Sequence, residues 1–160
     1  MSDDALLRTV ILDSHTPGAL SMPFGGDGLM DASGVWRILI VEDQEDLRDL
    51  LALTFSGGPF EVHLARDGQK ALEMAYHIRP HLVITDLRMP RMDGLALTRA
   101  LRQDPVLGRV PVIVITAWAD PGAELQVYGA GGNAFFAKPF SPLALLERAE
   151  HLLREYRRGG

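Results

Sequence analysis

The sequence has no cysteine, only two lysines and no long apolar run. Without cysteine, neither a disulfide framework nor a thiolate metal site is available. No apolar segment approaches the ~20 residues that cross a bilayer, and Asp3 and Asp4 stand where a secretory signal would carry positive charge. We therefore expect no membrane segment and a cytoplasmic location. Because arginine occurs fourteen times, the two lysines, Lys70 and Lys138, are candidates for a specific role.

The chain also lacks the concentrated positive charge of a nucleic-acid-binding face. Its formal net charge is -5, with five acids and one base in residues 1–35 and sixteen acids and fifteen bases in residues 36–160. A length of 160 residues with 47% hydrophobic residues suffices for one buried core but is short for two ordinary domains. We expect one domain with tails and no direct contact with nucleic acid.

The first 34 residues have the composition of an extension. Residues 16–34 are rich in Gly, Pro, Ser and Asp and show no apolar period. Leu6 to Leu12 is compatible with a short amphipathic element, but no capping signal accompanies it, so a frayed leader is favoured. We predict a flexible N-terminal extension over residues 1–34 and a folded domain over residues 35–158. Met22 and Met30 leave a later start of translation open.

Five short apolar runs alternate with segments of helical period in the rest of the chain. The predicted strands are residues 37–41, 62–65, 82–85, 110–115 and 134–137. Continuous apolar strands, each followed by a helix, predict a five-stranded parallel sheet covered on both faces, a doubly wound α/β fold. The helix around residues 122–128 is weakly specified, whereas Ser141 and Pro142 form a strong start for the last helix. In such sheets ligands bind at the carboxyl ends of the strands.

Polar residues follow four of the five predicted strands. Glu42 and Asp43 follow the first, Asp86 the third, Thr116 the fourth and Lys138 the fifth. Taken singly, each has an ordinary structural explanation as a helix cap, a turn residue, a strand end or a solvated cation. Because the sheet is expected to be parallel, all of them should nevertheless meet at one edge.

Together these residues form a chemically specific set. Three carboxylates held close together repel one another, and at least one must bind a proton unless a cation lies among them. Oxygen ligands without His or Cys suit a hard ion such as Mg²⁺. Lys138 adds a compact cationic donor and Thr116 a neutral one, both suited to phosphoryl oxygens. The set predicts phosphoryl transfer by positioning and charge neutralisation.

The order of these residues resembles the receiver domain of bacterial two-component response regulators, in particular the single-domain, chemotaxis-regulator-like members. The resemblance rests on Glu42-Asp43, Asp86, Thr116-Ala117 and Lys138-Pro139-Phe140, with separations of 43, 30 and 22 residues from Asp43 onward. Further matches are Asp67-Gly68, Met89-Pro90 and Asp93-Gly94. The resemblance covers about residues 35–157 and implies a (βα)5 flavodoxin-like fold.

The resemblance also implies a role for each residue. Asp86 would be the phosphoacceptor, and Glu42, Asp43, Asp86 and the backbone carbonyl of Arg88 would hold Mg²⁺. Thr116 and Lys138 would bind the phosphoryl oxygens, Thr116 and Phe135 would act as switch residues, and Lys138-Pro139 would be a cis peptide. Phe135 lacks a hydroxyl, and Gly131-Gly132 stands where Gly-Ala is common. In this family the lifetime of the phosphorylated state is thought to depend on the positions of Arg88 and Trp118. Neither side chain is a good general base for a water, so we expect slow loss of phosphate.

A protein of this kind is a switch rather than an enzyme. The implied phosphoryl donor is a sensor histidine kinase or a histidine phosphotransfer protein. The implied output is a protein target that binds the surface of the fourth helix, fifth strand and fifth helix, and a homodimer stays open. The main alternative is a receiver-like interaction module that works without phosphorylation. A haloacid-dehalogenase-type phosphatase needs an acid at Arg88, and a flavodoxin-like cofactor binder needs a phosphate loop in place of Glu42-Asp43, so both are disfavoured.

Overall fold

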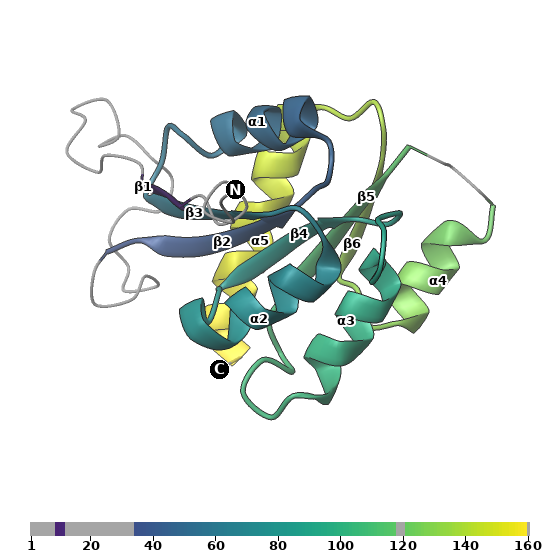
Figure 1. Cartoon of the computed structure of the whole chain (residues 1–160). Helices are drawn as coiled ribbons and strands as arrows, with labels where there is room; N and C mark the ends of the chain where they lie inside the picture. Colours follow the sequence, from purple (N-terminus) through teal and green to yellow (C-terminus); the bar gives the residue numbers. More distant parts are fainter. Residues whose placement is uncertain (1–8, 12–33, 118–120, 160) are drawn as a thin grey trace, which may run out of the picture.

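In the described part of the chain, six strands form one sheet in the order β1-β3-β2-β4-β5-β6, shown in Figure 1. The computed structural model describes residues 9–11, 34–117 and 121–159. The strands are β1 Thr9–Ile11, β2 Trp36–Val41, β3 Phe60–Ala65, β4 Leu82–Asp86, β5 Val112–Thr116 and β6 Ala134–Ala137. The helices are α1 Glu45–Thr54, α2 Gly68–Ile78, α3 Gly94–Gln103, α4 Ala123–Gly129 and α5 Pro142–Gly159.

Strands β2 to β6 pair in parallel, which confirms the predicted doubly wound α/β fold. Helices α1 and α5 cover one face of this sheet, and α2, α3 and α4 cover the other (Figure 1). Each face has its own apolar core, one around Trp36, Phe55 and Phe60 and the other around Leu97 and Leu101. Because helices occupy both faces, polar ligands have access at the ends of the strands. No described helix is both long enough and apolar enough to cross a membrane.

Strand β1 was not expected from the sequence. Thr9–Ile11 pairs antiparallel with β3, with Thr9 opposite His63 and Val10 opposite Val62. The β-branched sequence Thr-Val-Ile favours an extended chain, and β3 would otherwise be an edge strand with unpaired backbone groups. The frayed leader is therefore wrong for these three residues, while the remainder of the predicted extension, residues 1–8 and 12–33, lies outside the described part of the chain.

Local sequence signals account for most element boundaries. The side chain of Asp67 accepts a hydrogen bond from the Lys70 amide at 2.8 Å at the start of α2, and Ser141 Oγ accepts one from the Ala144 amide at 3.1 Å at the start of α5. Strand β5 pairs from Val112 rather than from the predicted Val110. Proline at position 111 has no amide hydrogen to donate, which explains the later start.

We propose that the independently folding unit begins at Val35, because the five parallel strands have a complete register without the residues before it. Deleting residues 1–34 should lower the melting temperature by only a few degrees, the scale on which ~1 kcal/mol appears for a domain of this size. Thermal unfolding followed by circular dichroism tests this. A much larger loss would mean that β1 and its neighbouring segments are an integral part of the fold.

Candidate functional site

The parallel sheet brings the predicted polar residues to one edge. Asp86 and Thr116 are the last residues of β4 and β5, and Glu42 and Lys138 directly follow β2 and β6. The Lys138 amide donates a hydrogen bond to the Thr116 carbonyl at 2.8 Å, which aligns the ends of β5 and β6. The Lys138-Pro139 peptide is cis, as the sequence analysis expected. Four segments far apart in sequence thus contribute to one site.

Three carboxylates form the centre of this site. Oxygen atoms of Glu42, Asp43 and Asp86 all lie within 4.8 Å of one another. Glu42 is 1% exposed and Asp86 8% exposed, whereas Asp43 is exposed. Glu42 and Asp86 are therefore shielded from solvent, whereas Asp43 is accessible to it. An all-oxygen set of this kind suits a hard divalent cation.

Lys138 supplies the cation in contact with the cluster. Its Nζ atom lies 2.9 Å from Asp86 Oδ2 and 3.5 Å from Glu42 Oε1. One ammonium facing three carboxylates leaves an excess of negative charge in a buried place, which is costly unless it is neutralised. The lysine that stood out by its rarity in the sequence thus contacts both buried acids.

The buried position of Glu42 changes its acidity. Burial raises the pKa of Glu42 from its ordinary value of 4.5 to about 8. The hydrogen bond that the Gln44 amide donates to Glu42 Oε2 at 3.0 Å lowers the pKa, the negative charge of Asp86 raises it, and Lys138 lowers it. A bound divalent cation would restore the carboxylate form, so the residues present fit a Mg²⁺ site.

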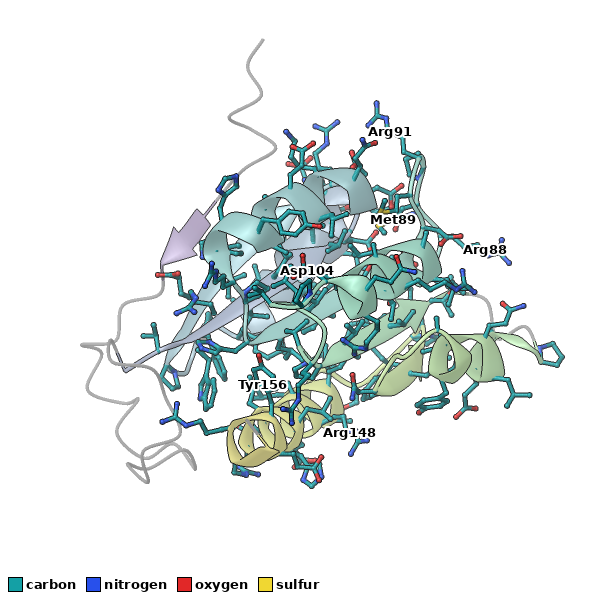
Figure 2. The ribbon with its side chains drawn as sticks, turned by 90° about the horizontal axis from the view of Figure 1, so that it is seen from below. Arg88, Met89, Arg91, Asp104, Arg148 and Tyr156 are labelled. Carbon is teal, nitrogen blue, oxygen red and sulfur yellow. The ribbon has the colours of Figure 1, made fainter. Side chains whose placement is uncertain are left out.

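The loop after β4 shapes the side of the site next to Asp86. The Arg88 amide donates a hydrogen bond to Asp86 Oδ1 at 3.2 Å. Figure 2 shows Arg88 and Arg91 extending outward from this loop, whereas Met89 points inward and packs against the core formed with α2, α3 and α4. The Arg88 side chain is exposed, so the backbone of Arg88 is the part that faces Asp86. The Arg88 carbonyl as a metal ligand stays a prediction.

The two predicted switch residues occupy different environments. Thr116 is buried at the carboxyl end of β5, at the same edge as the acidic cluster. Phe135 is half-buried on β6 and packs against the core beneath α2, α3 and α4. Trp118, which the sequence analysis paired with Arg88, lies outside the described residues.

Sequence reasoning did not single out Arg48. This arginine lies on α1 and is buried, and one of its guanidinium nitrogens donates a hydrogen bond to the Glu42 carbonyl at 2.9 Å. An arginine on an amphipathic helix ordinarily extends into solvent, so the sequence contains no signal for this contact.

The response regulator receiver domain family matches residues 38–150 of the chain. The chain belongs to this family. It is 36% identical over 118 residues to the response regulator PleD of Caulobacter vibrioides, an alignment that covers 74% of this chain and 26% of PleD. The chain spans less than half the length of the curated relatives that it matches.

Solved receiver structures resemble the chain over most of their length. The chemotaxis response regulator CheY4 of Vibrio cholerae is 27% identical with a TM-score of 0.69, covering 74% of this chain and 98% of CheY4. The receiver domain of the sensor histidine kinase PA1611 of Pseudomonas aeruginosa is 30% identical, with the same TM-score and coverage. That structure has a magnesium ion coordinated in its active site cleft. The chain is thus a receiver domain of the kind found in two-component systems.

Replacing Glu42 by Gln should change how the stability of this receiver domain depends on pH. Because the pKa of Glu42 is raised in the folded state, its contribution to stability is complete below pH 4.5 and is lost as the pH rises to about 8. Without Mg²⁺, Glu42→Gln should therefore be at least as stable as the wild type at pH 8, with a smaller decline between pH 6 and pH 8.

Thermal melts in chelator and in excess Mg²⁺ provide the measurement. Added Mg²⁺ should raise the melting temperature of the wild type more than that of Glu42→Gln, since a ligand that binds the folded state stabilises it. An equal Mg²⁺-induced rise in melting temperature for the two proteins would show that Glu42 does not bind the metal.

Proposed function

We propose that this receiver domain accepts a phosphoryl group on Asp86 and thereby switches a protein-interaction surface. The observation that carries the proposal is the contact of Lys138 Nζ with Asp86 Oδ2 at 2.9 Å inside a cluster of three carboxylates. Lys138 holds one Asp86 oxygen, and the Arg88 amide contacts the other. An anchored carboxylate of this kind is oriented for attack on phosphorus.

The reaction is the transfer of a phosphoryl group from a histidine of a donor protein. An Asp86 carboxylate oxygen attacks phosphorus, the phosphorus–oxygen bond forms and the phosphorus–nitrogen bond breaks. The leaving imidazole keeps the electron pair and takes up a proton. Lys138 and the Thr116 hydroxyl would receive phosphoryl oxygens as hydrogen-bond donors.

Glu42, Asp43, Asp86 and the carbonyl of Arg88 are the residues that would hold Mg²⁺. When bound, the ion would neutralise negative charge on the carboxylates and on the phosphoryl oxygens. The raised pKa of Glu42 and the excess of carboxylates over lysine support this cofactor. Lys138 contacts both buried acids and supplies one positive charge to them.

The donor is a sensor histidine kinase or a histidine phosphotransfer protein in the cytoplasm. Thr116 and Phe135 would couple the phosphoryl group to the surface of α4, β6 and α5. That surface carries exposed apolar side chains at Leu125, Tyr128 and Leu143, which suit a protein target or a second copy of the chain. The balanced charge of residues 36–160 supports protein rather than nucleic-acid contacts.

A receiver-like module that binds its partner without phosphorylation is the alternative. Such a module has no need for a buried Asp86 in contact with a lysine, because unneeded buried charges are costly. The intact cluster therefore supports the phosphorylated switch. Partner binding that is identical for wild type and Asp86→Asn under phosphorylating conditions would support the alternative.

Asp86 should be the sole phosphoacceptor. Incubation with a small acyl phosphate and Mg²⁺ should add one phosphate to the wild type and none to Asp86→Asn, as measured by intact mass. Asp93→Asn is a matched control because Asp93 caps α3 from the same loop, accepting a hydrogen bond from the Ala96 amide, and asparagine preserves that cap. Stoichiometric labelling of Asp86→Asn would overturn the assignment.

The phosphorylated state should be long-lived. Hydrolysis requires a water in line with the phosphorus–oxygen bond, and neither arginine at position 88 nor tryptophan at position 118 is a good general base. The double variant Arg88→Asn, Trp118→Glu should lose phosphate faster than the wild type at equal Mg²⁺ and pH, as followed by the decay of the phosphorylated mass. Equal decay rates would show that these side chains do not control access of water.

A further inference from the structure

Arg48 is a buried cation that has no role in the proposed phosphoryl transfer. It lies on α1, is 9% exposed, and follows Glu42 by six residues. A buried arginine is costly unless its donors are used, so its contacts indicate what it does. One of its guanidinium nitrogens donates to the Glu42 carbonyl at 2.9 Å, a buried hydrogen bond that reaches from the helix back to the end of β2.

Together with three other hydrogen bonds, this contact holds the loop between β2 and α1 in place. The Glu42 amide donates to the Ala65 carbonyl at 3.0 Å, which holds the residue to β3. The Glu42 side chain accepts a hydrogen bond from the Gln44 amide, and the Gln44 carbonyl accepts one from the Arg48 amide at 2.9 Å. Backbone and side chain of Glu42 are therefore both held, and Arg48 contributes through its amide and through its guanidinium.

We propose that Arg48 is a positioning residue that holds Glu42 and Asp43 in the arrangement that binds a divalent cation. The inference rests on the proposed Mg²⁺ site. Asp43 is exposed and follows directly on the carbonyl that Arg48 holds. Loss of that anchor frees the peptide between Glu42 and Asp43, so both ligands lose their fixed separation from Asp86. Outer contacts of this kind typically change metal affinity by about 10-fold to 100-fold.

Charge and position predict opposite effects at this site. Arg48 adds a positive charge near a site for a cation, so by electrostatics alone its removal should tighten Mg²⁺ binding. If Arg48 positions the ligands, its removal should weaken binding instead. The sign of the change therefore separates the two roles without any measurement of phosphotransfer.

The test is a Mg²⁺ titration of the whole chain followed by the NMR shifts of the Gln44 and Arg88 amides. Arg48→Met should raise the dissociation constant by about tenfold or more. Arg48→Lys should stay close to wild type, because a lysine ammonium also reaches a single carbonyl and keeps the charge. Arg48→Gln, neutral and shorter, replaces the methionine variant if that protein does not fold, and it should weaken binding in the same direction.

Arg102→Met is the matched control for a general loss of stability. Arg102 is a half-buried arginine that donates to the carbonyls of Gly131 at 3.0 Å and Val110 at 2.7 Å, at the amino ends of β6 and β5. These contacts lie at the opposite end of the strands from the acidic cluster. This variant should lower the melting temperature and leave Mg²⁺ affinity unchanged.

The outcomes separate the role of Arg48 from the presence of the Mg²⁺ site. Binding by the wild type with unchanged or tighter binding by Arg48→Met overturns the positioning role and leaves the proposed function intact. Equal weakening by Arg102→Met would also overturn it, because the effect would then follow stability rather than position. No binding by the wild type overturns the Mg²⁺ site, and the role of Arg48 with it.

Discussion

The carboxylates of Glu42 and Asp86 are held out of water beside one another, and one lysine contacts both. Much of the organisation around the site follows from that constraint. Two buried acids with an exposed third need more positive charge than Lys138 supplies, so the site is suited to a divalent cation and then to a phosphoryl group. Lys138 occupies its place because its own amide is bonded to the end of β5, which sets the last strand against the site.

Close packing around the strand ends maintains this arrangement. A Cβ atom at Gly94 would overlap the Asp86 carbonyl oxygen, and one at Gly68 would overlap the Met92 carbonyl oxygen. In Asp67-Gly68 and in Asp93-Gly94 the aspartate caps a helix. The glycine that follows has no side chain, so the start of the helix can approach the neighbouring carbonyl oxygen. The helices α2 and α3 therefore begin directly against the loop that follows Asp86. Substitution of either glycine would move that loop, and with it the backbone that faces Asp86.

The sequence predicted the five parallel strands and the edge at which the polar residues meet, because continuous apolar runs and strand-end positions are local signals. It did not predict β1, since three β-branched residues become a strand only when an edge such as β3 is available. It also missed Arg48, whose burial depends on how α1 packs on the sheet. The proposed ligand role of the Arg88 carbonyl and the proposed switch function of Phe135 depend on a bound ion and a phosphoryl group, and the partner depends on a second protein, so local sequence signals do not determine them.

Direct chemical localisation of the phosphoryl group tests the central claim, that the buried carboxylate held by Lys138 is the acceptor. After phosphorylation with acyl phosphate and Mg²⁺, borohydride reduces an aspartyl phosphate to homoserine, and peptide sequencing by tandem mass spectrometry locates the product. We predict homoserine at position 86, with none when Mg²⁺ is removed by chelator. Homoserine at position 43, or at any acid outside the cluster, would contradict it.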